Sequence, residues 1–379
     1  MDFDIPPDDA AIGEAVMRLS REVLARRATG IDRTGAFPHE NLRDLAALGV
    51  MGVNIPAELG GIGASPLGIV LAMEGMAWGC AATAAAVGAH YLATDALLIG
   101  GSEAQKARLL PPAARGETLG AYALTEPRSG SDPGGMVTRA TREANGWHLH
   151  GTKHFITNAG EADFIVVFAR TSDEPGHRGV SAFVVDARAE GITVGAPEDI
   201  MGIRGSRIYE VNFDTHLPGD ALVGEEGRGF RIAMAVLDRG RVDVAGMSLG
   251  VARAALDAAI GWAKERSAFS HRIAEYQGIQ WMLADMATSL EAARLLTFKA
   301  AWARKVARGR FSTEAAMAKL VASEAAGRIT DLSLQIHGGF GYTRALPVER
   351  FARDARILRI FEGSSEIQRN IIARALLDG

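Results

Sequence analysis

The spacing of apolar residues changes twice along the chain, and each change marks a different kind of structure. Over residues 8–120 apolar residues recur every three or four positions, the period of an amphipathic helix, as in Ala11, Ala15, Leu19 and Val23. A charged helix over 103–110, followed by Pro111 and Pro112, is expected to close this segment. The first third of the chain is therefore predicted to be α-helical.

The middle of the chain, residues 121–223, has the short apolar runs of β-strands. Runs at 164–168, 180–185 and 211–213 are separated by Gly, Pro, Asn and Asp, which favour turns. We expect a β domain of ordinary length here.

Helical spacing returns in the last part of the chain. One apolar stripe comprises Val242, Ala245, Leu249, Ala252 and Leu256, and another comprises Ile279, Leu283, Met286 and Leu290. Long helices that are apolar on more than one side pack as a bundle. We therefore predict three domains, 1–120, 121–223 and 224–379, packed as one body.

Composition excludes several classes of partner. A net charge of −4, from 41 basic and 45 acidic residues, leaves no excess positive charge to attract nucleic acid or anionic lipid. The single cysteine, Cys80, fits a reducing compartment, and the acidic opening Asp2 and Asp4 does not resemble a secretory signal. We expect a cytoplasmic protein with no nucleic-acid or membrane partner.

One stretch, residues 75–94, lacks charged residues and invites a membrane interpretation. Its Ala and Gly residues gain little from lipid, and it contains His90. A buried helix is the better interpretation.

Common nucleotide and metal motifs are not found. Neither a G-x-x-x-x-G-K-[ST] loop nor a strand-linked G-x-G-x-x-G occurs. His148, His150 and His154 lie close together, but no Asp, Glu or Cys follows at ligand spacing. Histidines exposed in a polar hairpin are therefore favoured over a metal site, and no metal is expected.

Glycine is enriched, with 44 of 379 residues, and its clusters coincide with candidate sites. The loop R-S-G-S-D-P-G-G at 128–135 could turn backbone N–H groups and the Ser131 hydroxyl towards an anion, although an ordinary surface turn has the same composition. A helix is expected to end at Gly338 and Gly339, where either a flat ligand or a crowded helix junction would explain the second glycine.

A further candidate is the segment F-E-G-S-S-E-I-Q at 361–368. Ser365 and Gln368 have capping-box spacing, so Ser365 is a candidate N-cap, and Glu366 suits the first turn of a helix. Glu362 has no such role. Beside an aromatic residue and a glycine it could be held out of water with a raised pKa and act as a base, or be an ordinary solvated loop carboxylate.

Seven motifs occur together in a fixed order. They are Y-A-L-T-E-P-R-S-G-S-D at 122–132, K-H-F-I-T-N at 153–158, M-G-I-R-G-S at 201–206, G-E-E-G-R-G-F at 224–230, R-S-A-F at 266–269, Q-I-H-G-G-F-G-Y at 335–342 and F-E-G-S-S-E-I-Q at 361–368. In this combination the chain resembles the acyl-CoA dehydrogenase family over nearly its whole length. It resembles the short-chain, butyryl-type branch most, notably through L-A-D-M-A, E-A-A-R-L-L-T and E-A-A-M-A-K-L-V-A-S-E-A-A.

The resemblance implies an α+β fold with an N-terminal all-α domain, a middle antiparallel β-barrel or sandwich, and a C-terminal four-helix bundle. It also implies bound FAD and the α,β-dehydrogenation of a short or branched acyl-CoA to the trans-2-enoyl-CoA, as in fatty acid β-oxidation. Glu362 matches the base that removes the α-proton, while hydride passes from the β-carbon to flavin N5. The Glu362 N–H and the flavin ribityl chain would donate hydrogen bonds to the thioester carbonyl. Electrons would leave through an electron-transfer flavoprotein, and a homotetramer, a dimer of dimers, is expected.

Further site residues follow from the same resemblance. The flavin ring and pyrophosphate would be lined by Tyr122, Leu124, Thr125, Ser131, Phe155, Ile156 and Thr157. The adenosine half would be met by Ser364 and Glu366 and, from a neighbouring subunit, by Arg266, Phe269, Gln277, Gln335 and Gly339. The substrate would be met by Ser131, Asp238, Arg241 and Gly363. For Asp238 and Arg241 the alternative is an ordinary charge pair on a helix surface.

Some positions depart from the common pattern of the family. Phe155 stands where many members have Trp, Glu366 where many have Gln, and Ser270 where Gly is usual. Ser270 affects a turn beside the adenosine pyrophosphate, because Gly tolerates backbone angles that Ser resists. Gly240 occupies a position where a minority of members place the catalytic carboxylate, which leaves Glu362 without a rival.

Other functions are possible on the same scaffold. Reduced flavin could react with oxygen in an oxidase or a monooxygenase, although a monooxygenase needs no base such as Glu362. An acyl-carrier-protein thioester could replace the CoA ester. The alternative from a different class is a catalytically silent ligand-binding relative. Chain length and branching of the acyl group are not determined by the sequence.

Overall fold

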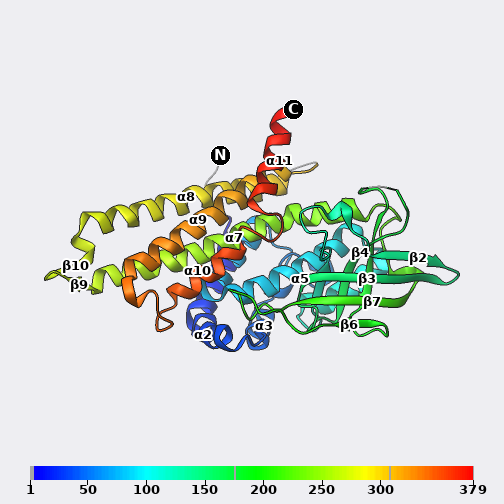
Figure 1. The fold of residues 1–379 in the computed structure, drawn as a ribbon, viewed down its shortest axis with the longest axis horizontal. Helices are drawn as coiled ribbons and strands as arrows, with labels where there is room; N and C mark the ends of the chain where they lie inside the picture. Colours follow the sequence, from blue (N-terminus) through cyan, green and yellow to red (C-terminus); the bar gives the residue numbers. More distant parts are fainter. Residues whose placement is uncertain (1–3, 175, 307–308, 379) are drawn as a thin grey trace.

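The N-terminal region is helical, as the apolar spacing predicts. The computed structural model describes residues 4–174, 176–306 and 309–378. Its first helices are α1 (Pro7–Leu19), α2 (Ala25–Thr34), α3 (His39–Ala47), α4 (Pro66–Gly79), α5 (Ala81–Gly100) and α6 (Glu103–Ala114). The turns between them are η1 (Ser20–Leu24), η2 (Val50–Gly52) and η3 (Ala57–Leu59). Helices α2 and α3 lie at the edge of the molecule below the long C-terminal helices in Figure 1.

The end of α6 differs from the prediction. The helix does not stop at Leu110 but continues through Pro111 and Pro112 to Ala114. Leu110 and Ala114 are buried in the core that α6 shares with the sheet, and this packing outweighs the two backbone hydrogen bonds that the prolines remove.

The uncharged stretch 75–94 is not one buried helix but parts of two. Helix α4 ends at Gly79, Cys80 has an extended backbone (φ −154°, ψ 101°), and α5 begins at Ala81. Both helices are apolar on nearly every side, so the spacing of apolar residues carried no sign of the break.

Two helices are long and apolar enough to cross a membrane by length and composition alone. They are α5 and α7 (Gly229–Glu265), and most of each is buried inside the protein. Helices buried in a protein core also meet this criterion of length and apolar composition, so the burial of α5 and α7 within the protein accounts for their composition.

The middle region forms one mixed sheet. Its strands are β1 (Gly120–Ala123), β2 (Arg139–Glu143), β3 (Gly146–Thr157), β4 (Phe164–Arg170), β5 (Val180–Asp186), β6 (Ile192–Val194), β7 (Ile208–Pro218) and β8 (Leu222–Val223), with turns η4 (Pro133–Gly135) and η5 (Gly219–Ala221). The spatial order is β6-β7-β3-β2-β4-β5-β8, and β1 pairs with β4. Most pairings are antiparallel, as expected, but β1 runs parallel to β4, and β2 meets β4 in a parallel pair.

Strand β4 is buried on both faces. Phe164, Val166 and Phe168 face a core shared with α5 and α7, whereas Ile165 and Val167 face a second core inside the β region. The alternation follows from the two-residue period of a strand. One face of the sheet is thereby fixed against the two helices.

The C-terminal region is a bundle of long helices, as predicted. It contains α7, α8 (Gln277–Val306), α9 (Ser312–His337), α10 (Val348–Ile357) and α11 (Ser365–Leu377), with the small hairpin β9 (Ser267–Ala268) and β10 (His271–Arg272) and turns η6 (Ile273–Glu275) and η7 (Gly338–Phe340). Helices α7, α8 and α9 pack on one another, α10 packs on α9 and α7, and α4 also packs on α7. The α7 stripe that includes Val242 and Leu249 is buried. The domain boundaries at 120 and 223 stay predictions.

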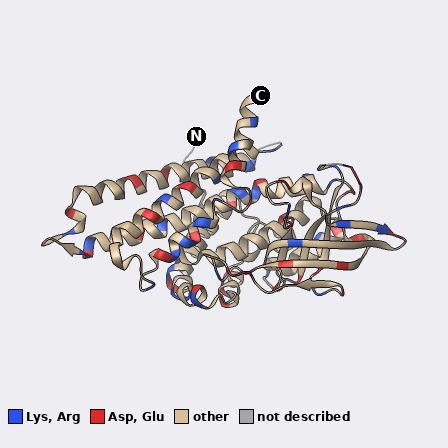
Figure 2. Cartoon of the chain, in the orientation of Figure 1, with Lys and Arg blue, Asp and Glu red and all other residues tan. Residues whose placement is uncertain are grey.

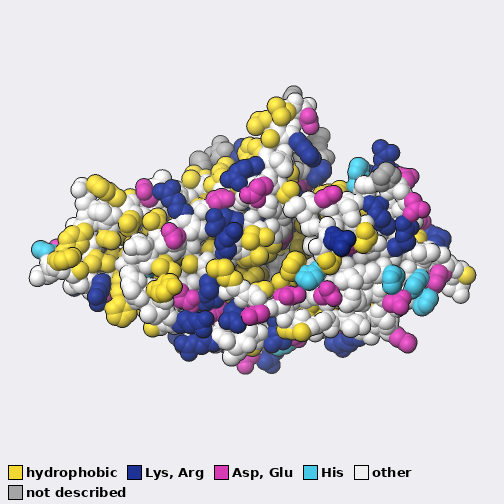
Figure 3. Space-filling view, in the orientation of Figure 1, with side chains coloured by type: hydrophobic (Ala, Val, Ile, Leu, Met, Phe, Trp, Pro, Cys, Tyr) yellow, Lys and Arg dark blue, Asp and Glu magenta, His cyan; other side chains and the backbone are white. Residues whose placement is uncertain are grey.

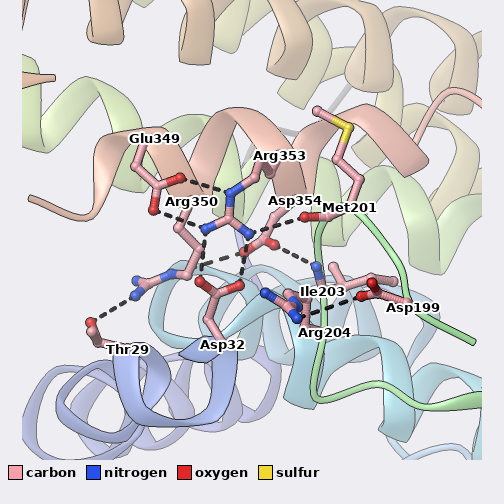
Figure 4. A network of polar contacts seen from close by, with 10 residues as sticks. All are labelled: Thr29, Asp32, Asp199, Met201, Ile203, Arg204, Glu349, Arg350, Arg353 and Asp354. Atoms are coloured by element: carbon pink, nitrogen blue, oxygen red, sulfur yellow. Dashed lines mark hydrogen bonds and ion pairs between the residues drawn. The ribbon is translucent and has the colours of Figure 1, made fainter. Parts of the chain in front are cut away.

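A polar junction joins the three regions (Figure 4). Arg353 of α10 donates to both oxygens of Asp32 of α2 (2.8 and 2.7 Å) and to the carbonyl of Met201 (3.0 Å). Asp354 accepts a hydrogen bond from the N–H of Ile203 (2.5 Å), whose φ is +47°. The 201–206 motif is therefore held between α2 and α10, which precedes the segment of Glu362.

Charged residues of both signs lie on the helices and the sheet. Figure 2 shows Lys and Arg interspersed with Asp and Glu along the helices and at the ends of the strands. On the side shown in Figure 2, charges of both signs therefore lie near one another.

Candidate functional site

Glu362 lies in a strained turn between α10 and α11. Its φ is +52°, a left-handed conformation that is unfavourable for a residue other than glycine, and Gly363 follows with φ +94°. Two donors hold the Gly363 carbonyl: the Lys319 ammonium at 2.7 Å and the Gln368 amide at 2.8 Å. The turn that carries Glu362 is thus fixed from α9 and from α11.

The carboxylate of Glu362 points into the protein. Part of the residue is accessible, but its Oε2 atom is buried and has no hydrogen-bond partner among the described residues. Gly240 of α7 makes room for it: a Cβ at Gly240 would stand 2.1 Å from Glu362 Oε2 and 2.7 Å from Leu92 Cδ2. The oxygen is therefore buried between α7 and α5.

Burial dominates the acid–base properties of this carboxyl. Burial first, and the charge of Asp243 second, raise the pKa of Glu362 to about 8 against the opposing charges of Lys319 and Arg241. Burial also raises the pKa of Asp243 to about 7 and lowers the pKa of Lys319 to about 8. A carboxyl with a pKa near neutrality can exchange a proton under physiological conditions.

The start of α11 corrects the predicted capping box. The helix begins at Ser365, and Ser364 is the N-cap. The Ser365 hydroxyl donates to Glu324 on α9 (2.7 Å), and the Gln368 side chain donates to the Gly363 and Glu362 carbonyls instead of a cap N–H. The error arose because Ser365 had a tertiary partner that sequence spacing does not show. Glu366 does lie in the first turn of α11.

Asp238 and Arg241 are not a surface pair. Both are buried, and Arg241 donates to Asp238 Oδ1 at 2.6 Å. The other oxygen of Asp238 accepts from Arg310 (3.1 Å) and Ser312 (2.6 Å). Asp238 thus has partners on both oxygens, whereas the buried Nε of Arg241 has none among the described residues.

A bulge in β3 presents the Phe155–Thr157 segment. The β3–β7 register shifts between Lys153 and Ile156, and Phe155 has φ +58° with 57 % of its surface exposed. The N–H of His154 bonds the Thr125 carbonyl (2.9 Å), so the Thr125 segment and the bulge lie side by side. Ile156 is buried, and Thr157 is half-buried.

Tyr122 and Leu124 have their side chains in the core between the sheet and the helices. Tyr122 donates to the Ala233 carbonyl (3.4 Å), and burial, followed by the charge of Glu362, raises its pKa. Tyr122 therefore lies within electrostatic reach of Glu362.

Ser131 is exposed in a loop that a buried ion pair closes. Glu126 accepts from the N–H groups of Val137 (2.6 Å) and Thr138 (3.0 Å) at the far side of that loop. Lys153 of β3, which is fully buried, donates to Glu126 (2.8 Å) and to the Leu124 carbonyl (3.0 Å). The loop of Ser131, β1 and the bulged strand are thus tied together.

The residues expected to serve a neighbouring subunit lie elsewhere. Arg266, Phe269 and Gln277 lie in or next to the β9–β10 hairpin, Gln335 lies in the last turn of α9, and Gly339 lies in the turn η7 that follows it. The guanidinium of Arg266 is 5.4 Å from the centroid of the Phe340 ring, and 91 % of Phe269 is exposed. Figure 1 shows this hairpin at the end of the bundle opposite the β region.

The predicted site residues therefore form two separate groups within one chain, one around Glu362 and one at the β9–β10 hairpin. Glu362 has Tyr122, Arg241 and Gly363 around it, and Ser364 and Glu366 follow as the N-cap and in the first turn of α11. The hairpin group stands apart at the bundle tip. Sequence reasoning missed Lys319 and Asp243, although Lys319 interrupts a buried apolar stripe with Ala315, Ala316, Ala322 and Ala326.

The histidine group lies on the exposed face of the sheet. His148 bonds Asp214 (2.8 Å), His150 approaches the same carboxylate (3.6 Å), and His148 stacks on His216. Within the described residues no group of three or more His, Cys, Asp or Glu is arranged to hold a metal ion. A separate groove of about 860 Å³ is lined by α8, α9, Ala352, Arg359 and Arg369 and does not include Glu362.

Known proteins match this chain over nearly its whole length. The models described as acyl-CoA dehydrogenase N-terminal, middle and C-terminal domains match residues 6–117, 121–216 and 227–377. The short-chain specific acyl-CoA dehydrogenase, mitochondrial, of Bos taurus is 43 % identical over 376 residues, 99 % of this chain and 91 % of that protein.

Solved structures agree with this match. The butyryl-CoA dehydrogenase of Megasphaera elsdenii is 39 % identical, covers 100 % of both chains and has a TM-score of 0.97. A chain in a structure of the electron transferring flavoprotein of Acidaminococcus fermentans is 38 % identical, covers 100 % of both chains and has a TM-score of 0.98.

Proposed function

The chain belongs to the acyl-CoA dehydrogenase family, and on this premise we propose that Glu362 is the base that removes the α-proton of a short or branched acyl-CoA thioester. Members of the family are FAD-dependent oxidoreductases, and acyl-CoA dehydrogenation is the activity of this chain. The trans-2-enoyl-CoA is the proposed product. The observation that carries the proposal is the buried Oε2 of Glu362 opposite Gly240, which has no hydrogen-bond partner in the described part of the chain.

The surroundings of Glu362 suit proton abstraction. In the ionised form its carboxylate takes the proton from the α-carbon, and the burial of Oε2 strengthens it as a base. The N–H of Glu362 has no acceptor among the described residues and is available to the thioester carbonyl. A donor at that carbonyl stabilises the negative charge that develops on oxygen.

The residues present fit FAD. Phe155 keeps an exposed ring on a left-handed backbone, an arrangement that a flat ring stacked on it would stabilise. The positions of Gly338 and Gly339 are open, since a Cβ there would meet nothing within 4 Å. Bound FAD supplies the acceptor for the hydride that leaves the β-carbon. Phe155–Thr157, Thr125 and Ser131 would hold its ring and pyrophosphate.

A short acyl chain is proposed from the position of Leu92. This α5 side chain reaches the space beside Gly240 and Glu362, where a Cβ at Gly240 would stand 2.7 Å from its Cδ2. A bulky residue next to the base leaves little room beyond the β-carbon. We expect Leu92→Ala to improve reduction by longer acyl-CoAs relative to butyryl-CoA.

A homotetramer is also proposed, because one chain leaves large apolar side chains exposed. Trp281 and Trp302 of α8 are 62 % and 63 % exposed, and Leu377 of α11 is 85 % exposed. Helix α11 projects from the body in Figure 1, and Figure 3 shows hydrophobic side chains gathered at the bundle end with the β9–β10 hairpin. Light scattering on a sizing column tests this: a monomeric holoenzyme contradicts the tetramer, and W281S/W302S should dissociate it.

An electron-transfer flavoprotein is the proposed electron acceptor, and a cytoplasmic location is part of the same proposal. The similarity to a chain in the electron transferring flavoprotein structure of A. fermentans supports this electron acceptor. The free, buried Cys80 agrees with a cytoplasmic location. Stopped-flow reoxidation distinguishes this acceptor from oxygen. Fast reoxidation by air would favour an oxidase.

The test of the base is anaerobic titration with acyl-CoAs of graded length and branching, read by flavin absorbance. Glu362→Gln should keep FAD and thioester binding and lose about 10²–10⁴-fold in the rate of reduction. Glu190→Gln, which changes an exposed carboxylate outside the proposed site, is the matched control and should be reduced normally. Normal reduction of Glu362→Gln by butyryl-CoA would refute the assignment. Acyl-carrier-protein thioesters in the same titration test that alternative carrier, and absence of reduction by every thioester would favour a silent relative.

A further inference from the structure

Lys319 is a buried cation whose role the reaction does not explain. It is inaccessible to solvent in the N-terminal half of α9, and the Gly363 carbonyl is its hydrogen-bond partner at 2.7 Å. Within the described residues its ammonium makes no ion pair. Burial of an ammonium group with one neutral acceptor is unfavourable, so a counter-charge nearby is expected.

Among the acidic groups, Glu362 has the largest electrostatic effect on Lys319. Its charge is the largest electrostatic influence that favours the charged form of Lys319, and Lys319 in turn is the largest that favours the ionised form of Glu362. The two side chains do not touch. They interact across the turn whose carbonyl Lys319 holds.

The other charges around the turn are largely engaged. Arg241 is neutralised by Asp238 at 2.6 Å, and Asp243 has Arg304 at 3.5 Å. Besides each other, Glu362 and Lys319 are acted on by charges from α7, α9 and α11: Arg241, Asp243, Glu324 and Glu366. The groups that act in turn on Arg241 and Asp243 are Tyr122, Asp238 and Arg310 for Arg241, and Arg304, Asp95 and Arg239 for Asp243. Arg241 and Arg310 both form ion pairs with Asp238. Within the described residues, Lys319 is therefore the cation acting on Glu362 that no ion pair balances.

Resting on the function proposed above, we propose that Lys319 is a positioning residue for the base: its ammonium holds the Gly363 carbonyl and favours the ionised form of Glu362. Gln368 offers a natural comparison, because its amide donates to the same carbonyl without a charge. The hydrogen bond and the charge can therefore be separated by substitution.

The two variants for this test are Lys319→Gln and Gln368→Leu. Lys319→Gln keeps an amide donor and removes the charge, whereas Gln368→Leu removes a neutral donor and keeps the charge. Without the cation Glu362 should be harder to ionise, so the rising limb of kcat/KM against pH should move to higher pH. We expect the rate of Lys319→Gln to be about tenfold lower at pH 7 and to approach wild type above pH 9, where Lys319 itself loses its proton. Gln368→Leu should lower the rate by the same factor at every pH.

A second measurement does not need turnover. The infrared carbonyl band of protonated Glu362, obtained as the difference between wild type and Glu362→Gln holoenzymes, should persist to higher pH in Lys319→Gln. Lys319→Arg keeps the charge and should leave the band and the rate profile in place, and it decides the question if Lys319→Gln does not fold.

The outcomes separate the two proposals. An equal loss at all pH values in Lys319→Gln, an unmoved band, or a displaced profile in Lys319→Arg would overturn the role of Lys319. If no acyl-CoA reduces the wild-type flavoprotein, the proposed function fails, and the band still reports on Lys319.

Discussion

The Glu362 carboxylate occupies the space that a side chain at Gly240 would fill. A Cβ at residue 240 would stand 2.1 Å from Glu362 Oε2, well inside van der Waals contact. The absence of a side chain on α7 is therefore a condition for a carboxylate at 362 to point inward.

Gly240→Ala should displace Glu362 and slow flavin reduction. We expect a loss of about 100-fold, because displacement of a reacting group by about 1 Å has an effect of that size. The same helix provides the control: a Cβ at Gly261 would meet nothing within 4 Å, so Gly261→Ala should keep the rate and slightly raise the melting temperature. Stopped-flow reduction by butyryl-CoA and thermal unfolding measure both effects; equal rates in the two variants would contradict the proposed displacement.

The raised pKa of Glu362 predicts a pH dependence of stability. Its pKa is about 8 in the folded protein against 4.5 as the ordinary value, so the folded state binds more protons than the unfolded state between these values. The contribution of Glu362 to stability is therefore present at low pH and lost as pH rises towards 8. Glu362→Gln lacks this contribution to the slope, so its melting temperature relative to wild type should rise from pH 5 to pH 8.5. Asp243 and Asp354 also titrate with raised pKa values, but they are present in both proteins. If the melting temperatures of the two proteins change with pH in the same way, Glu362 ionises at its ordinary pKa.

Lys153→Met should destabilise the β region and weaken FAD binding. The change leaves Glu126 buried without its cation, and breaking one side of a buried ion pair costs about 3–5 kcal/mol. Lys106→Met is the control, because Lys106 pairs with the highly exposed Glu103 and its loss should stay within about 0.5 kcal/mol. Urea unfolding gives the free energies, and fluorescence titration of the apoprotein gives FAD affinity. Similar effects of the two changes would contradict a special role for the buried pair.

Ser270→Gly should stabilise the β9–β10 hairpin. Phe269 and Ser270 both have positive φ (+51° and +66°) in a two-residue turn, a geometry that favours glycine. Relief at one residue should raise the free energy of unfolding by about 1 kcal/mol. Ser267→Gly, in the extended strand β9, is the control and should bring no gain. A lower melting temperature for Ser270→Gly, measured on the holoenzyme, would show that the serine makes a compensating contact.

Apolar spacing predicted the order of helices and strands, because each element buries one face or both. The α7 stripe from Val242 to Leu256 and the β4 run at 164–168 lie in the core for this reason. Apolar spacing did not predict the break between α4 and α5 at Cys80, because both helices are apolar on nearly all sides. The proline signal placed the end of α6 too early, because tertiary packing keeps Pro111 within the helix.

The candidate site was only partly accessible to sequence reasoning. Glu362 stood out because no local role explained it, but the partners that set its chemistry come from α7 and α9. Neither the approach of Asp243 nor the contact of Lys319 with Gly363 has a signature in local spacing. Ser365 shows the opposite error: its spacing suited a cap, whereas its hydroxyl bonds Glu324.

The shared space of residues 240 and 362 also bears on how enzymes of this kind diverge. A lineage that moves its carboxylate from the loop to the helix cannot do so by adding the new acid first, since the two side chains would collide. Shortening residue 362 first clears the room but leaves an ancestor with no base at either place. The two arrangements are thus separated by a mutational valley, and an ancestral sequence that bridges them should carry changes in the neighbouring walls that let both acids coexist.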